Sequence, residues 1–241
     1  MSPEPPLLRI ETLTKRFGGF RALDGVSFEL NAGEVLGLVG PNGSGKTTCI
    51  NVISGLYPPD GGRVVFAGRS IGGTASHRLA RRGINRTFQS PKPFLSVTVQ
   101  ENVEIAATYG SIGAPPDLSA LLISLELDRH AGRTAGELNS AQQKTLDLAR
   151  ALATQPRLLL VDELAAGLNP TELTRMADRL RALANSGMAL LIVEHLMGFI
   201  DQVTDRVVVM NAGKEFFEGT LGAATRDPEV IRVFLGGTPH A

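Results

Sequence analysis

A glycine-rich loop that ends in a lysine constrains the fold of this chain more than any other feature. Residues 40–47 have the sequence GPNGSGKT, which matches the spacing G-x-x-x-x-G-K-[ST]. The apolar residues 34–39 (EVLGLV) predict a fully buried strand before the loop, and residues 48–53 predict a helix after it. Strand, loop and helix in this order are the context that the motif requires. The loop therefore predicts an α/β sheet.

The residue types of this loop suit it to bind phosphate. Glycines let consecutive backbone N–H groups converge on phosphate oxygens, and the helix N-terminus adds a favourable dipole. Lys46 brings a positive charge to the outer phosphates, and the Thr47 hydroxyl is a ligand for Mg2+. We predict a nucleoside triphosphate site; its residues are Gly40, Pro41, Asn42, Gly43, Ser44, Gly45, Lys46, Thr47 and Thr48. The alternative is a glycine-rich turn without a ligand.

Two further apolar runs end in side chains that can act on a nucleotide. Residues 157–163 (RLLLVDE) place Asp162 and Glu163 at the end of a buried strand, where α/β folds bind their ligands. We expect Asp162 to hold Mg2+ through its hydration shell and Glu163 to polarise the attacking water. Residues 188–193 (MALLIV) are followed by Glu194 and His195, and the His195 imidazole would reach the γ-phosphate and the water near Glu163. The alternatives are a helix-capping pair of acids and a surface or core histidine.

Helical and strand-like segments alternate along the rest of the chain. Asn169 is a predicted N-cap, Pro170 follows at the first helical position, and Gly187 ends a helix that crosses between two strands. The first 70 residues predict short strands and turns, whereas residues 98–154 are almost entirely helix-like. The residues after His195 have room for a strand, a hairpin turn at 211–213 and two short helices.

The composition is that of an ordinary soluble globular protein. The 24 basic and 24 acidic side chains balance, which argues against a general nucleic-acid binder. Cys49 is the only cysteine, which excludes a disulfide framework, and we expect it on a buried helix face. The longest apolar run has six residues, too few for a membrane span, and the start MSPEPPLLRI lacks the basic region of a secretory signal. We expect the protein to stay in the cytosol.

Taken in order, the motifs resemble those of the nucleotide-binding subunit of ABC transporters. The set comprises GPNGSGKTT, Gln89 in NRTFQ, LLLVDE, AAGLNP and His195 in VEH, and it covers nearly the whole chain. The resemblance implies an α/β fold: a P-loop NTPase core of the ABC type with an N-terminal antiparallel β subdomain and an inserted α-helical subdomain. It implies one ABC ATPase domain over residues 1–241. Residues 1–92 and 145–241 would form the β-rich edge and RecA-like core, and residues 93–144 the helical subdomain.

The resemblance also implies roles for single residues. Phe17 would stack on adenine, with a core phenylalanine as the alternative. Gln89 would touch Mg2+ or water and couple the site to a permease, and Asn169 would lie at a dimer-facing turn. The family's signature segment, usually LSGGQ, caps the ATP of the opposite subunit. It corresponds here to Leu138, Asn139, Ser140, Ala141 and Gln142.

Two departures from the family pattern lead to a hypothesis of asymmetry. The signature is LNSAQ, in which both glycines and the usual serine are replaced, and Leu164 stands where the family usually has proline. Added Cβ atoms would hinder close approach of the backbone to phosphate. We expect this chain to hydrolyse its own ATP only against a partner with a good signature.

Within the superfamily, several segments look most like ATPases of branched-chain amino-acid importers: KRFGGFRAL, FLSVTVQENV and DPEVIRVFLG. This implies an ATP- and Mg2+-dependent ATPase that energises a membrane importer from the inner face of the membrane. Its partners would be permease subunits, a second ATPase chain as a homo- or heterodimer, and indirectly an extracytoplasmic substrate-binding protein, with no nucleic acid.

Two alternatives remain open for the function. One is a soluble ABC ATPase acting on a ribosome or DNA, which the single cassette, the lack of heptads and the zero net charge disfavour. The other is a nucleotide-binding subunit with little hydrolysis, for which the altered signature and Leu164 are the motive.

Overall fold

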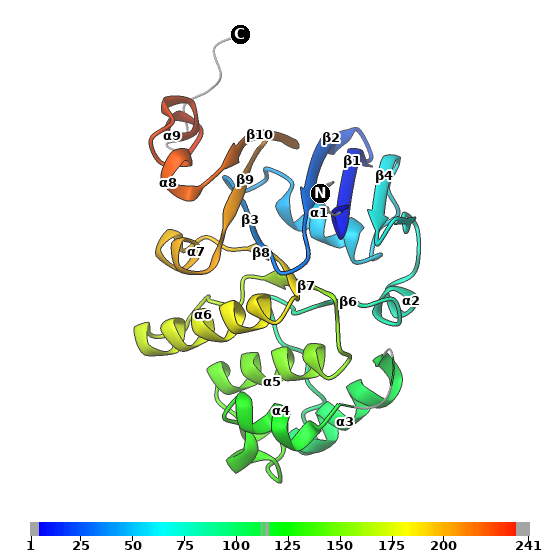
Figure 1. The fold of residues 1–241 in the computed structure, drawn as a ribbon, viewed down its shortest axis with the longest axis vertical. Helices are drawn as coiled ribbons and strands as arrows, with labels where there is room; N and C mark the ends of the chain where they lie inside the picture. Colours follow the sequence, from blue (N-terminus) through cyan, green and yellow to red (C-terminus); the bar gives the residue numbers. More distant parts are fainter. Residues whose placement is uncertain (1–4, 112, 114–115, 235–241) are drawn as a thin grey trace.

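A computed structural model describes residues 5–111, 113 and 116–234, arranged as two sheets and a group of helices (Figure 1). The first four residues, and Leu235 and Gly236 of the segment DPEVIRVFLG, lie outside the described residues. At one end lies an antiparallel four-stranded sheet in the order β2-β1-β4-β5. Its strands are β1 (Leu8–Phe17), β2 (Phe20–Leu30), β4 (Gly61–Phe66) and β5 (Arg69–Ser70). The expected antiparallel N-terminal unit is confirmed.

The second sheet has six strands in the order β10-β9-β3-β8-β7-β6. They are β3 (Val35–Val39), β6 (Ile84–Arg86), β7 (Leu158–Asp162), β8 (Ala189–Val193), β9 (Arg206–Asn211) and β10 (Lys214–Gly219). Only β10 pairs antiparallel; the other neighbours are parallel. The three predicted buried strands are β3, β7 and β8, and all their residues are buried.

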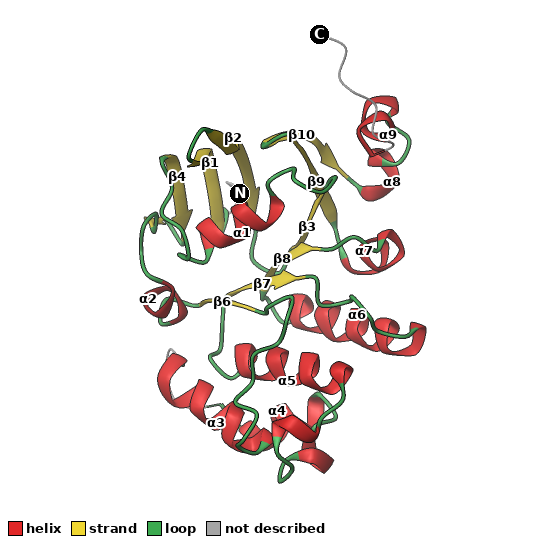
Figure 2. Ribbon diagram, turned by 180° about the vertical axis from the view of Figure 1, so that it is seen from behind, coloured by secondary structure: helices red, strands yellow, loops and turns green. Residues whose placement is uncertain are grey.

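A hydrophobic core lies on each face of the second sheet. On β7, Leu159 and Val161 pack with the helices, whereas Leu158 and Leu160 pack toward the antiparallel sheet. Helix α1 (Lys46–Ile53) lies between the two sheets (Figure 2). Its Cys49 is buried, as predicted, and burial raises the pKa of the thiol to about 12. Alternating side chains thus fix β7 between two layers.

The predicted crossover helix is α6 (Pro170–Asn185). Asn169 is its N-cap and accepts a hydrogen bond from the N–H of Glu172, whose carboxylate in turn accepts from the N–H of Asn169. Pro170 occupies the first helical position, where its missing N–H costs nothing. The helix joins β7 to β8 and covers one face of the sheet (Figure 2).

The helical insertion lies at the opposite end from the antiparallel sheet (Figure 1). It contains α3 (Val99–Gly110), α4 (Leu118–Ser124) and the 3-10 turns η1 (Asp128–His130) and η2 (Ala135–Glu137), followed by α5 (Ser140–Leu152). A short helix, α2 (Ser76–Ala80), precedes β6. Helix α5 begins inside the signature segment because Asn139 and Gln142 form a capping box.

The segment after β8 contains one more helix than expected. Helix α7 (Met197–Val203) follows β8 directly, and its Phe199, Ile200 and Val203 are buried. The β9–β10 hairpin turns at residues 211–213, and α8 (Leu221–Ala224) and α9 (Pro228–Phe234) follow. In the part of the chain that the structure describes, no helix has both the length and the hydropathy needed to cross a membrane.

Candidate nucleotide-binding site

Four neighbouring strands of the second sheet end at one edge, and each is followed by a predicted site residue. The phosphate loop follows β3, His195 follows β8, Asp162 ends β7 with Glu163 directly after it, and Gln89 follows β6. These strands are adjacent in the order β3-β8-β7-β6. Since parallel strands present their carboxyl ends at the same edge, residues far apart in sequence gather there.

The backbone of neighbouring segments packs closely against two glycines of the phosphate loop. A Cβ atom on Gly40 would lie 2.1 Å from the carbonyl oxygen of Met210, and one on Gly45 would lie 2.6 Å from that of Ala22. Both glycines have a positive φ, and Gly45 is the N-cap of α1 without any side-chain cap. Close backbone packing therefore requires glycine at positions 40 and 45, in addition to any requirement from a ligand on the open face of the loop.

Lys46 is a buried ammonium whose hydrogen-bond acceptors are neutral groups. Its Nζ donates to the carbonyl oxygens of Gly40 (2.8 Å) and Pro41 (2.9 Å). Burial lowers the pKa of Lys46, and the charges of Glu163 and Asp162 oppose that shift. Within the described residues no carboxylate forms an ion pair with it. Such a cation fits an anionic ligand such as a phosphate.

Glu163 brings two other predicted residues together. Its Oε1 lies 3.0 Å from His195 Nε2, and its Oε2 accepts a hydrogen bond from Gln89 Nε2. The His195 side chain is 44% exposed, so the core-histidine alternative is wrong. Because Asn169 rather than either acid caps α6, the helix-capping alternative for Asp162 and Glu163 is also wrong.

Asp162 is buried and faces a partner that the sequence did not indicate. Its Oδ2 lies 3.0 Å from Arg86 Nη2. Burial raises the pKa of Asp162, whereas the Arg86 charge opposes that shift. Arg86 also donates to Asn51 on α1 and to Ser54, the C-cap of that helix. The arginine thus joins β6, β7 and the helix that carries the phosphate loop.

The donor set suits a hard cation that retains water. The described residues contain no group of three or more His, Cys, Asp or Glu side chains placed to hold a metal ion. Thr47 is exposed on the first turn of α1, and Asp162 supplies a carboxylate at the same sheet edge. Few protein oxygens, water and substrate phosphates together are what Mg2+ prefers.

Phe17 is an exposed aromatic residue at the end of β1. It is 43% exposed, which excludes the core alternative, and its ring meets that of Tyr57 edge-on with centroids 5.2 Å apart. Lys15 Nζ lies 5.7 Å from the Phe17 centroid. No sequence motif indicated Tyr57, which comes from the loop after α1.

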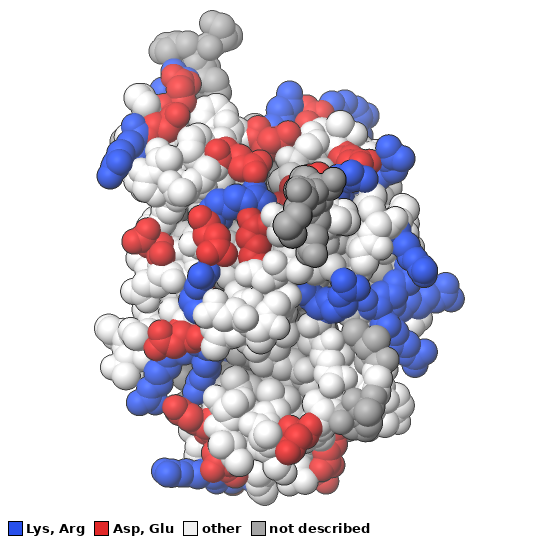
Figure 3. Space-filling model, viewed as in Figure 1, with Lys and Arg blue, Asp and Glu red and all other residues white. Residues whose placement is uncertain are grey.

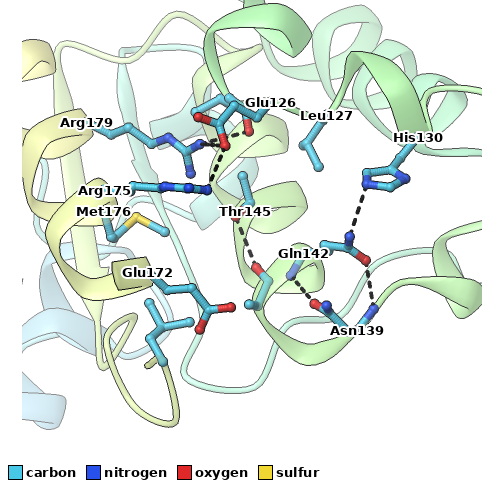
Figure 4. Close-up of a pocket in the computed structure, with 13 residues that line it drawn as sticks. Glu126, Leu127, His130, Asn139, Gln142, Thr145, Glu172, Arg175, Met176 and Arg179 are labelled. Carbon is cyan, nitrogen blue, oxygen red and sulfur yellow. Dashed lines mark hydrogen bonds and ion pairs between the residues drawn. The ribbon is translucent and has the colours of Figure 1, made fainter. Parts of the chain in front are cut away.

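The signature segment lies away from these residues, beside the helical insertion. Leu138 is buried, Asn139 caps α5, and Ser140 and Ala141 form its first turn. Gln142 Nε2 lies 3.0 Å from His130 Nε2 (Figure 4). Among the described residues no hydrogen bond or ion pair joins residues 138–142 to residues 40–48. Within one chain, the signature segment and the phosphate loop thus lie at separate places in the fold.

A small cavity of about 230 Å³ opens next to the signature segment (Figure 4). Glu126 bridges Arg175 and Arg179 of α6 across it, each at 3.3 Å. Asn169 is exposed at the nearby start of α6. The cavity marks a boundary between the insertion and the sheet-covering helix, crossed here by an ion pair.

Comparisons with known proteins show which family the chain belongs to. Residues 23–166 match the family model described as ABC transporter. The chain is 35% identical to the high-affinity branched-chain amino acid transport ATP-binding protein BraF of Pseudomonas aeruginosa, over 96% of this chain and 98% of BraF. It is 36% identical to the corresponding protein LivG of Escherichia coli, with the same coverage.

Solved structures show the same fold. An ATP-binding cassette of an ABC transporter in its ADP conformation is 34% identical, with a TM-score of 0.88 over 96% of this chain and 99% of that one. A dimeric cassette in a post-hydrolysis state, bound to ADP and Pi, is 25% identical, with a TM-score of 0.79 over 89% and 98%. The chain belongs to the ABC transporter family and is one of its ATPases.

Proposed function

We propose that this chain is the ATP-hydrolysing subunit of a membrane importer for branched-chain or similar amino acids. The observation that carries the proposal is the convergence of Gln89, Glu163 and His195 beside the phosphate loop. The names of the relatives, at 35–36% identity over nearly the full chain, supply the transport role and the class of substrate.

In this proposal the sheet edge binds and hydrolyses ATP. Lys46 and the loop N–H groups bind the phosphates, and Phe17 stacks on adenine. Bound Mg2+, held by Thr47 and by Asp162 and Gln89 through water, would neutralise charge on the phosphates. Glu163 accepts the proton of the attacking water, and His195 orients Glu163 through their 3.0 Å contact.

In the proposed dimer, each nucleotide lies between the phosphate loop of one chain and the signature segment of the other. The N–H groups of Ser140 and Ala141, at the exposed start of α5, would face the nucleotide of the opposite chain. Asn169, also exposed, lies at the proposed dimer-facing turn. A dimer is supported by the dimeric cassette of similar fold.

The proposed permease face lies between the core and the helical insertion. A groove there carries the exposed aromatic residues Phe88, Phe94 and Tyr109. Exposed Arg78, Arg81 and Arg82 on and after α2 add basic charge beside it, and basic side chains gather over α2 in Figure 3. Basic residues favour the anionic inner leaflet, so this face supports attachment at the inner side of the membrane.

A nucleotide-binding subunit with little hydrolysis is the second candidate, and the signature segment favours it. Asn139 accepts the N–H of Gln142, so this N–H is less free to bind a partner's phosphate. Leu164, the other departure, is buried in the hydrophobic core, where its side chain packs.

The test is ATP turnover of the purified chain, alone and with the second ATPase and permease pair of its operon. We expect turnover to appear in the complex and to fall in the Glu163→Gln variant while ATP binding persists. Robust cooperative turnover by the isolated homodimer would refute the asymmetry. Equal, negligible turnover of wild type and Glu163→Gln in the complex would favour the second candidate.

A further inference from the structure

Helix α5 carries two buried charges on one side. Lys144 and Asp147 are 5% and 4% exposed. Because they are three residues apart, they lie on the same side of the helix. A buried charge is tolerated only when it is hydrogen-bonded, so each needs acceptors or donors from a neighbouring segment.

Lys144 binds the backbone of the loop that follows β7. Its Nζ donates to the carbonyl oxygens of Leu164 (3.0 Å), Glu163 (3.3 Å) and Ala166. An ammonium group has three donors, so a single loop satisfies all of them. Burial lowers the pKa of Lys144, and the charges of Glu194 and Glu163 oppose that shift.

The same loop is also bound by the last residue of β8 and by the residue that follows it. The N–H of Ala165 donates to Glu194 Oε1 at 2.6 Å, and the N–H of Glu163 donates to the carbonyl oxygen of Val193 at 2.9 Å. Glu163 has a φ of 49°, which side chains other than glycine rarely adopt. The loop is thus fixed in a conformation that requires its surroundings.

Asp147 binds the backbone of the loop that follows β6. Its Oδ2 accepts the N–H of Phe88 at 2.9 Å. Burial raises the pKa of Asp147, and this N–H opposes that shift. Phe88 precedes Gln89, and Gln89 donates to Glu163. One side of α5 therefore binds both the loop after β6, which carries Gln89, and the loop after β7, which carries Glu163.

We propose that Lys144 and Asp147 are positioning residues through which α5 fixes Glu163 and Gln89. Since α5 starts at Ser140, this clamp ties both side chains to the signature segment. In a dimer the signature would face the partner's nucleotide, whereas Glu163 would act on the chain's own. Helix α5 thus joins the two sites, an inference that rests on the roles given to Glu163 and Gln89 under the proposed function.

Amide hydrogen exchange of the isolated chain tests the clamp without requiring activity. We expect Lys144→Met to speed exchange at residues 163–168 by about tenfold or more and to leave Phe88 and Gln89 unchanged. Asp147→Ala should do the reverse. Lys144→Arg and Asp147→Asn, which keep a donor and an acceptor, should retain protection, and Lys214→Met, at an exposed site, is the matched control.

Unchanged exchange at residues 163–168 in Lys144→Met would overturn the proposal. So would equal loosening of both loops and of α5 itself in either variant, because the charges would then only stabilise the helix.

Steady-state turnover in the assembled complex gives the second readout. We expect Lys144→Met to lower kcat about tenfold or more with KM for ATP unchanged within about twofold, and Lys144→Arg to restore most of the loss. A fall through KM alone would overturn the proposal. If instead the loops loosen as expected but Glu163→Gln retains full turnover, the clamp stands and the role that the proposed function gives to Glu163 fails.

Discussion

Two helices of this chain begin at segments proposed to face a nucleotide, and they begin differently. Helix α1 has Gly45 as its N-cap and no side-chain cap. Helix α5 has Asn139 as its N-cap, in a reciprocal capping box with Gln142. The N-terminal N–H groups of α1 are left to a ligand, whereas α5 satisfies part of its own. The phosphate-loop half of the proposed site (residues 40–48) therefore needs a ligand to satisfy the N-terminal N–H groups of its helix. The signature half (residues 138–142) has a cap of its own and is stable without a ligand.

The largest effect is expected from Lys46→Ala in the phosphate-loop half. ATP affinity should fall by about 100-fold or more, because the variant loses the charge that meets the outer phosphates. The free energy of unfolding without nucleotide should change little, since a buried ammonium with neutral partners contributes little net stability. Calorimetric titration and urea unfolding measure both, with Lys214→Ala as control. Retained affinity would contradict the proposed role of the loop.

A smaller effect is expected from His195→Ala at the same sheet edge. Turnover should fall by about 100-fold with ATP affinity preserved, because His195 contacts Glu163 and not the phosphate loop. Single-turnover kinetics and nucleotide titration separate these quantities. If affinity fell as far as turnover, His195 would belong to binding rather than to hydrolysis.

The signature half should respond in the opposite direction. Replacing Asn139→Ser, Ser140→Gly and Ala141→Gly together should raise turnover by about three- to tenfold, since the partner's phosphate gains closer access to the backbone. Two glycines in the first turn of α5 should also lower stability by up to about 2 kcal/mol. ATP turnover and thermal unfolding of the same samples test this. Unchanged turnover would show that LNSAQ does not limit hydrolysis.

Local pattern was sufficient to predict the scaffold of the phosphate-loop half. The loop motif, the buried runs of β3, β7 and β8, and the Asn169-Pro170 start of α6 each depend on neighbours in sequence. Parallel pairing then brings Gln89, Glu163 and His195 together, because the ends of adjacent strands share one edge.

The roles of several charged residues depend on tertiary contacts, which the sequence does not show. Arg86, Lys144 and Asp147 are charged residues to which no motif assigned a role, and Asp162, Glu163 and Phe88, which they contact, lie 76, 19 and 59 residues away along the chain. The start of α5 does have a local signal in the sequence, because Asn139 is followed by Gln142 at the capping-box spacing.

The smallest effect is expected from Asn139→Ala, which tests whether Asn139 acts as a helix cap or through the nucleotide of the partner chain. Asn139→Ala should lower the free energy of unfolding by about 1 kcal/mol, the usual loss for an N-cap side chain. Asn169→Ala at α6 is the matched control, because it removes the same atoms from the same kind of capping box. Urea unfolding of the isolated chain should give equal losses for the two variants. In the assembled complex Asn139→Ala should also alter turnover through the trans site, because it frees the N–H of Gln142. If Asn139→Ala costs no stability, α5 is not stabilised by its own cap, and the contrast with α1 does not hold.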